Sequence, residues 1–196
     1  MSTGMLGLII VAIICLVVVQ LYNRLVSLRN RFLNGFSQIE VQLQRRYELI
    51  PNLVETAKAY MNHESETLVA VTEARNQASQ RCADAAVDPQ NASLVEALAS
   101  AENTLSSAMG QLNFVMESYP ELKADTQMLE LQEELTSTEN RVAFARQAYS
   151  DAVMQYNTAR EQFPAIIIAN TFSFKEADLF EVSEPAMKQP VTVSFA

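Results

Sequence analysis

The side chains most able to do chemistry do not have the spacing of a known catalytic or metal site. The sequence has one histidine, His63, which lies between Asn62 and Glu64. The residue three positions before it is Tyr60, so neither HExxH nor the Glu-x-x-His pair of di-iron bundles is present. His63 is therefore expected to be a residue of a helix surface.

The other reactive or acidic residues give the same result. Cys15 lies inside an apolar run and Cys82 lies far along the chain, so they form no disulfide framework. The cluster of Glu133, Glu134 and Glu139 is typical of a solvated helix face. The four glycines are isolated, and a phosphate-binding loop needs them grouped. We therefore predict a non-enzymatic protein without catalytic residues, cofactor or metal.

Composition and charge favour an acidic, helical protein. The chain has 196 residues, a net charge of −9, and only 4 Gly and 6 Pro, which leaves little material for β-turns. The acidic excess follows Lys58, because residues 22–58 contain more Lys and Arg than Glu. An acidic body lacks the basic face that phosphate backbones require, so nucleic acid is excluded as a partner.

Residues 1–21 are expected to form a transmembrane anchor. Met5 to Leu21 contain no charged residue, and their helical length of about 25 Å approaches the thickness of the hydrocarbon core. A cleaved signal peptide is the alternative, but no basic residue precedes Met5 and no small-x-small site follows the run. The expected partner of this segment is the lipid bilayer.

Three arginines after the anchor predict its orientation. Arg24, Arg29 and Arg31 follow within ten residues of the apolar run, and Lys and Arg favour the cytoplasmic side. We therefore expect the N-terminus outside and the bulk domain in the cytoplasm. The same arginines are candidates for contact with anionic headgroups.

Residues 22–163 are predicted to form a bundle of long helices. Apolar residues recur at steps of three and four from Leu21 to Tyr47, Ile50 to Val71, Leu94 to Met116, and Met128 to Phe163. Pro51 is expected to bend or break the first helix near Tyr47 to Pro51. The predicted fold is all-α: the transmembrane helix leads into an antiparallel up-and-down bundle. A turn at Pro51 gives four helices, whereas a kink gives three, with a long first helix that a homo-oligomer would cover.

Several long segments resemble one protein family in order along the chain. They are YNRLVSLRNRF from Tyr22, VQLQRRYELIPNLVETAKAY from Val41, HESETLVAVTEARNQA from His63, YPELKAD from Tyr119, ENRVAFARQAYSDAVMQYN from Glu139 and FSFKEADLFE from Phe172. Together these segments resemble the LemA family. The resemblance implies a bacterial inner-membrane protein, anchored at its N-terminus, with a helical bundle and no established activity. Relatives are linked with membrane remodelling, including magnetosome membrane formation, and with membrane protease systems.

Two Tyr-Asn pairs suggest a polar contact at the base of the bundle. Asn23 follows the anchor, and Asn157 lies near the end of the last long helix. In a four-helix topology both would lie close to the membrane, so we predict a hydrogen bond between the two asparagines.

The segment 164–181 is more apolar than the linker that the resemblance implies. Ile167, Phe172 and Phe174 belong to a run too short to cross a bilayer. In the four-helix topology it could lie in the membrane interface or cap the core. With one long first helix, it would meet another subunit at a distal rim.

Residues 182–196 are expected to form an extended tail. Val191, Val193 and Phe195 alternate with polar residues after Pro190, which fits a strand that pairs with a partner, although terminal disorder is the alternative.

Two functions are compatible with the sequence. One is a structural or scaffolding protein that self-assembles as a homo-oligomer at the inner membrane and possesses no enzymatic site. The other is an accessory of a membrane-bound protease or AAA-type ATPase. The size of the detergent-extracted protein distinguishes them.

Overall fold

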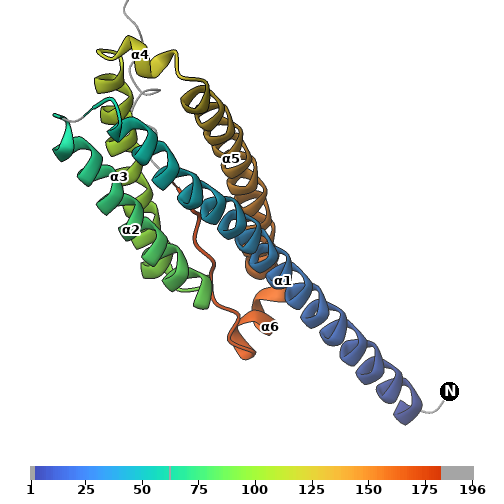
Figure 1. Cartoon of the computed structure of the whole chain (residues 1–196). Helices are drawn as coiled ribbons and strands as arrows, with labels where there is room; N and C mark the ends of the chain where they lie inside the picture. The colour runs from blue at the N-terminus through green and yellow to red at the C-terminus, as the bar shows by residue number, and fades with distance from the viewer. Residues whose placement is uncertain (1–2, 62, 182–196) are drawn as a thin grey trace, which may run out of the picture.

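The computed structural model describes residues 3–61 and 63–181, and six helices account for most of them. In chain order they are α1 (Thr3–Lys58), α2 (Ser65–Val87), α3 (Ala92–Met116), α4 (Pro120–Lys123), α5 (Thr126–Glu161) and α6 (Ala165–Thr171). No strand occurs in the described residues. The prediction of an all-α fold with an N-terminal apolar helix and an antiparallel bundle is confirmed (Figure 1).

Helix α1 belongs both to the anchor and to the bundle. Its 56 residues span about 84 Å at 1.5 Å per residue. The N-terminal part projects beyond the other helices, and the C-terminal part packs among them (Figure 1). Within the bundle one face is buried at helical spacing: Leu25, Phe32, Phe36, Ile39, Leu43, Tyr47, Ile50, Leu53 and Ala57. The same rigid element therefore carries the apolar projection and the core.

The predicted break at Pro51 is wrong. Helix α1 continues through Pro51 to Lys58, and the chain reverses over residues 59–64 instead. Pro51 has no N–H to donate to the carbonyl of Tyr47, but Nε of Arg75 on α2 donates to that oxygen at 2.8 Å. A neighbouring helix thus replaces the missing bond, and the buried stripe continues through Leu53 and Ala57. The bundle has four long helices, but the first turn lies beyond the proline.

Helices α2 and α3 form a hairpin beside α1. The buried stripe of α2 consists largely of small residues, which permit close packing of α3: Ala74, Ala78, Cys82 and Ala85. Its partner α3 supplies the larger side chains Leu98, Leu105, Met109 and Leu112. Asn91 caps α3, because its Oδ1 accepts a hydrogen bond from the backbone N–H of Ser93 at 3.2 Å.

Helix α5 runs antiparallel to α1 and returns toward its projecting part (Figure 1). The two helices meet through aromatic pairs, with the ring of Phe32 5.0 Å from Tyr156 and the ring of Phe36 5.8 Å from Tyr149 between centroids. Gly35 lies against Tyr149, and a Cβ at Gly35 would be 3.3 Å from the Cα of Tyr149. A glycine at this position lets the helix backbones approach closely.

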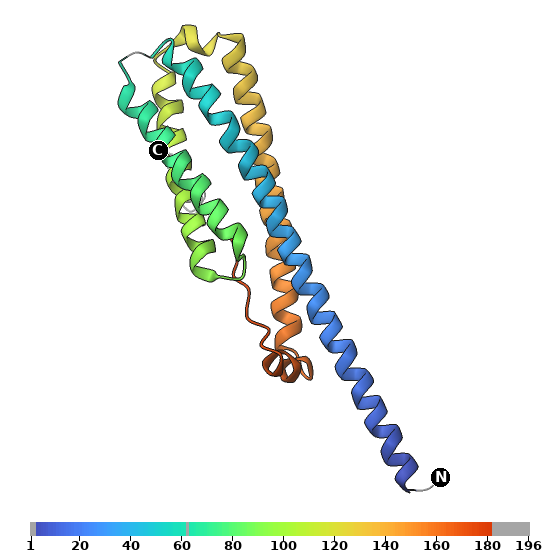
Figure 2. The same cartoon turned by 60° about the horizontal axis from the view of Figure 1, so that its bottom comes forward.

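After α6, the chain turns back into the bundle as an extended segment, residues 174–181, which we call the C-terminal strap. In both views it runs between the α2–α3 hairpin and the α1–α5 pair (Figures 1 and 2). Phe174, Ala177 and Phe180 are buried there. The strap therefore completes the core between the two helix pairs.

Candidate functional site

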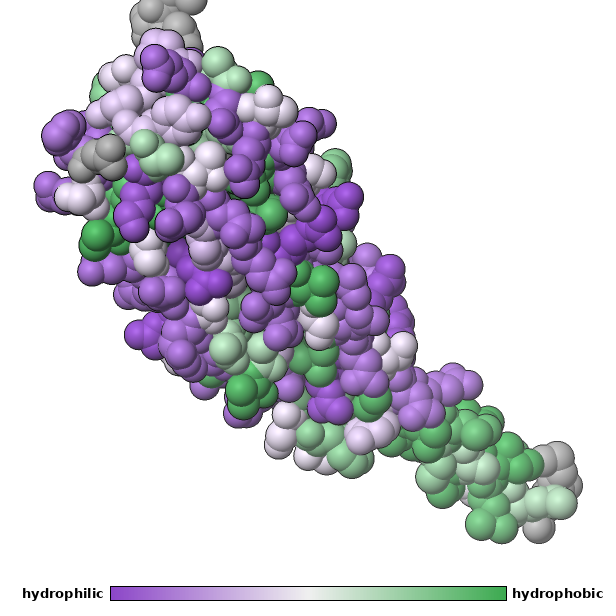
Figure 3. All heavy atoms as spheres, viewed as in Figure 1, coloured by the Kyte–Doolittle hydropathy of each residue, from purple (hydrophilic) through white to green (hydrophobic). Residues whose placement is uncertain are grey.

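The projecting part of α1 has the surface of a membrane span. Its most apolar 18-residue window has a mean hydropathy of 2.9, and none of that window is buried. The space-filling view shows this end as continuous apolar surface, while the body is mainly hydrophilic (Figure 3). Met5 to Leu21 thus have the length and composition to cross a bilayer, and of these residues Val18 and Leu21 alone are partly buried against the core of the bundle.

An aromatic cluster lies where α1 leaves this apolar stretch. The ring of Tyr22, directly after Leu21, packs edge to face against Phe172 at 5.0 Å and against Phe174 at 5.6 Å between centroids. Phe174 is buried, whereas Phe172 is 52% exposed. The two phenylalanines predicted as interface residues therefore both contact Tyr22, at the end of the bundle from which the apolar part of α1 projects.

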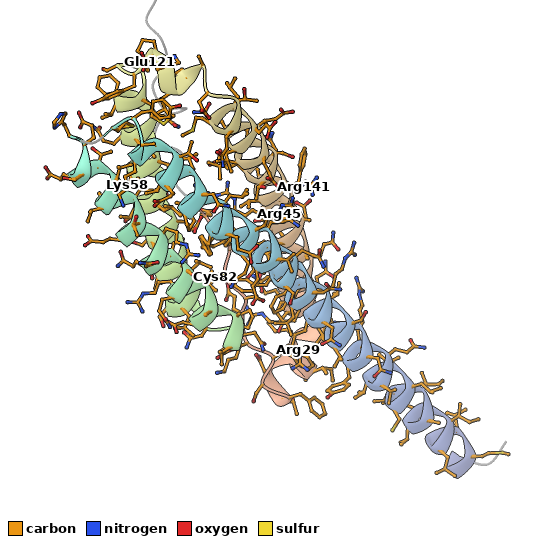
Figure 4. The ribbon with its side chains drawn as sticks, viewed as in Figure 1. Arg29, Arg45, Lys58, Cys82, Glu121 and Arg141 are labelled. Atoms are coloured by element: carbon orange, nitrogen blue, oxygen red, sulfur yellow. The ribbon has the colours of Figure 1, made fainter. Side chains whose placement is uncertain are left out.

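The three arginines predicted to contact lipid headgroups lie on α1 in the turns that follow Tyr22. The guanidinium carbon of Arg29 lies 5.3 Å from the centre of the Phe174 ring, a cation–π geometry between α1 and the strap (Figure 4). Nη1 of Arg31 donates a hydrogen bond to Oε1 of Gln155 on α5 at 3.1 Å. Arg24 lines a groove of about 410 Å³ between α1 and α5, together with Met154 and other residues. All three cations thus lie next to the exit from the apolar stretch.

Helix α6 has a buried face and an exposed face. Ala165, Ile168 and Ala169 are buried against the bundle, at the i, i+3, i+4 spacing of one helix face. Ile167 on the other face is 55% exposed. The packing of α6 at the membrane-proximal end excludes the distal-rim position that a single long rod would have given it.

The strap is held to α5 by a row of polar side chains. The hydroxyls of Tyr149 and Tyr156 donate to the backbone oxygens of Asp178 and Lys175 at 2.9 and 2.7 Å. Between them, Nδ2 of Asn157 donates to the oxygen of Ala177 at 2.8 Å, while its Oδ1 accepts from the nitrogen of Ala177 at 3.1 Å. Because a strap outside a sheet has no neighbouring strand, these side chains satisfy its backbone groups.

Two further details strengthen the attachment of the strap. Nη2 of Arg160 pairs with Oε2 of Glu176 at 2.9 Å. Burial, followed by the nearby charge of Asp178, raises the pKa of Tyr149 to about 12, so this phenol stays a neutral donor.

The predicted hydrogen bond between Asn23 and Asn157 is wrong. Asn157 turns toward Ala177 on the strap, and Asn23 is exposed on α1. A side-chain amide has one acceptor atom and one donor nitrogen, and a single backbone residue matches both here. This role of Asn157 was not predicted from the sequence. Tyr149 and Tyr156 on one helix stripe were the available signal, because buried tyrosine hydroxyls require partners.

A second polar group lies buried inside the bundle. Glu102 of α3 accepts hydrogen bonds from Nη1 of Arg46, at 2.8 Å, and from the hydroxyl of Tyr47, and both partners belong to α1. Nη2 of Arg46 also lies 3.4 Å from Oε1 of Glu139 on α5. This cluster connects three helices and was not predicted from the sequence.

Burial, together with the charge of Glu102, suppresses the ionisation of Tyr47 and Cys82. Burial, followed by the charge of Glu102, raises the pKa of Tyr47 far above its usual range. Burial, followed by the charges of Glu40 and Glu102, raises the pKa of Cys82 to about 12. The thiol of Cys82 is therefore neutral near pH 7 and a poor nucleophile.

Comparison with known proteins identifies the family. The sequence model of the LemA family matches residues 35–195, which is most of the chain. The chain belongs to the LemA family. It is 26% identical over 162 residues to the Protein LemA of Metamycoplasma hominis, covering 83% of this chain and 69% of that protein. It is also 24% identical over 185 residues to the magnetosome proteins MamQ 1 and MamQ 2 of Paramagnetospirillum magneticum, covering 87% of this chain and 68% of each relative.

Membership of the LemA family agrees with the helical bundle and the apolar N-terminal helix of the structure. The family match begins inside α1 and includes the buried polar cluster, α6 and the strap. The names of the relatives carry no enzymatic activity, and the apolar end of α1 gives this LemA family chain a candidate membrane anchor. The relatives and the structure together indicate a membrane-associated protein built on a helical bundle.

Within residues 3–61 and 63–181 no group of three or more His, Cys, Asp or Glu side chains is placed to hold a metal ion. His63 is exposed in the turn between α1 and α2. The predicted tail contacts Val191, Val193 and Phe195 lie outside the described residues.

Proposed function

We propose that this LemA family chain is a non-enzymatic structural protein that self-assembles on the bacterial inner membrane. Its continuous first helix carries the proposal: α1 is both the candidate span and a core helix of the bundle, without a linker between them. A flexible linker would let the bundle turn freely above the bilayer, whereas a continuous helix fixes its direction. Copies held in one orientation can pack side by side with little further loss of rotational freedom.

Exposed aromatic side chains on the body offer contacts between copies. Phe144 on α5 is 77% exposed and Phe114 on α3 is 69% exposed. Phe144 lies about 26 Å along α5 from the C-terminal end of that helix, since each residue rises 1.5 Å. A contact there would join neighbouring bundles well above the lipid surface. We take Phe144 as the first candidate for a contact between copies.

The proposed orientation has the bundle in the cytoplasm. Arg24, Arg29 and Arg31 lie within the first turns of α1 beyond the apolar stretch, and basic residues so close to a span favour the cytoplasmic side. The names of two relatives, magnetosome proteins, are consistent with a role at a membrane. Membrane shaping by the assembled protein would follow from many rigid bodies held against one bilayer.

The size of the full-length protein extracted in mild detergent tests the proposal. Self-assembly predicts a large symmetric particle in light scattering, and Phe144→Ser should reduce its size. Val87→Ser, in an equally exposed position at the α2 end, is the matched control and should leave the size unchanged. A monomer that copurifies with a membrane protease or AAA-type ATPase would contradict self-assembly and favour the accessory role.

A further inference from the structure

Helix α6 and its flanking residues present an apolar surface that the bundle does not cover. Phe163 is 82% exposed, Ile166 is 39% exposed, and Ile167 and Phe172 are each exposed by more than half. The stretch from Gln162 to Phe174 contains no charged residue. These four large apolar side chains lie within residues 163–172, on α6 and its two ends, and we call their exposed surface the patch; most protein surfaces expose such side chains singly.

This patch lies level with the end of the candidate span. Phe172 contacts Tyr22, which directly follows the uncharged stretch ending at Leu21. Helix α6 therefore lies beside the place where α1 leaves the bundle (Figures 1 and 2). If the bilayer surrounds Met5 to Leu21, its surface meets the patch at the level of Tyr22. A tyrosine at that level is typical of a membrane–water interface.

The charges beside the patch match a lipid surface. Arg24, Arg29 and Arg31 follow Tyr22 along α1, on its side away from the candidate span; Arg29 lies over the ring of Phe174, and Lys175 directly follows that residue. Cations just above an apolar surface can contact anionic headgroups while the apolar side chains enter the acyl boundary. The cation–π contact holds Arg29 against Phe174, which fixes one of these charges at the rim.

We infer that α6, with Phe163 and Phe172, lies in the lipid interface, so that the chain contacts the bilayer at a second place beside its span. A second copy of the chain is the less suitable occupant, because four side chains provide less than the roughly 800 Å² per partner of a standard protein interface. The inference rests on the membrane anchor and is independent of self-assembly. Its consequence is a bundle braced against the membrane by two separate elements.

The sequence contains no tryptophan, so one introduced Trp reports its own environment. Full-length Ile167→Trp is reconstituted in phosphatidylcholine and phosphatidylglycerol vesicles, with or without bromine on the acyl chains near the headgroups. The emission of the introduced indole should shift to shorter wavelength and lose most of its intensity in brominated vesicles. Leu129→Trp, at the opposite end of α5 and about as exposed as Ile167, is the aqueous control, and Val17→Trp, inside the apolar stretch of α1, is the lipid control.

Each result decides the inference. Quenching like that of the Val17 variant supports a lipid contact. Quenching by aqueous iodide like that of the Leu129 variant, without a bromine effect, overturns it. Blue-shifted emission that neither quencher reaches also overturns it, because that result indicates a protein contact. Phe172→Trp is the second probe if Ile167→Trp alters the helical circular dichroism of the protein, and the same three outcomes apply.

Discussion

Nε of Arg75 on α2 donates a hydrogen bond, 2.8 Å long, to the backbone oxygen of Tyr47 on α1. Tyr47 is the residue whose carbonyl would accept from position 51, where Pro51 has no N–H. The arginine therefore supplies the donor that the proline lacks. The same bond connects α1 to α2 eleven residues before α1 ends at Lys58.

Replacement of Arg75 by Leu should lower the free energy of unfolding by about 1–3 kcal/mol, because the carbonyl of Tyr47 is then left without a donor. In the Pro51→Ala background the loss should be smaller, since the backbone N–H that this substitution introduces can bond to the carbonyl of Tyr47. Chemical denaturation of the four proteins in this double-mutant cycle measures the coupling. Equal losses of unfolding free energy in both backgrounds would show that the bond to the carbonyl of Tyr47 does not cause the destabilisation.

Pro51 also shows which parts of the fold can be predicted from the sequence. The apolar stripe of α1, its exposed apolar end and the helical class follow from local spacing, and they were predicted correctly. At Pro51, the missing hydrogen bond to Tyr47 is replaced by one from Arg75, a residue 24 positions after the proline. Helix rules that consider only neighbouring residues cannot predict such a contact from another helix. The strap was missed for a similar reason, because its backbone bonds are made by side chains of α5 rather than by a regular pattern.

Asn157→Ala should lower the free energy of unfolding by about 1–2 kcal/mol. The substitution removes both hydrogen bonds to the backbone of Ala177 and leaves that part-buried N–H and C=O without partners. Limited proteolysis should cut near the strap faster than in the parent protein. Asn23→Ala is the control, because its exposed amide has no hydrogen bond in the described residues, and it should leave thermal unfolding unchanged. Equal destabilisation by both substitutions would contradict the attachment role of Asn157.

Gly35 and Gly110 are both helical, but only Gly35 has a close neighbour. A Cβ at Gly35 would lie 3.3 Å from the Cα of Tyr149, and a Cβ at Gly110 would have nothing within 4 Å. Gly35→Val should therefore force α1 and α5 apart and cost about 1–3 kcal/mol. Gly110→Ala should stabilise the protein by up to about 1 kcal/mol, because Ala favours helix over Gly. Thermal unfolding of the two variants gives opposite shifts if the close approach is correct.

Ionisation of Tyr149 should weaken the fold at high pH. A tyrosine in an unfolded chain titrates near pH 10, and the folded pKa of Tyr149 is about 12. Because the folded pKa is the higher one, the stabilisation is complete below about pH 10 and is lost as the pH rises to about 12. The parent should exceed Tyr149→Phe in free energy of unfolding at pH 8, and the difference should shrink by pH 12. A constant difference in urea titrations would contradict this role of Tyr149.

Adjacent isoleucines of α6 should respond differently to a charge. Ile168 is 8% exposed and packs against the bundle, so Ile168→Asp places a carboxylate in the core and should cost roughly 3 kcal/mol or more. Ile167 faces outward, so Ile167→Asp should leave the thermal midpoint of the detergent-solubilised chain nearly unchanged. In vesicles, however, the introduced carboxylate would have to enter the lipid interface.

Measurement of Ile167→Asp in detergent and in vesicles distinguishes a core cap from a lipid contact. With Phe172→Trp as the reporter, Ile167→Asp should move the emission to longer wavelength and reduce quenching by brominated lipid. Ile167→Val, which keeps an apolar side chain, should leave both signals unchanged. If Ile167→Asp unfolds the protein in detergent as Ile168→Asp does, both faces of α6 are part of the core. If it changes neither the fold nor the lipid signals, the exposed face of α6 does not contact the bilayer.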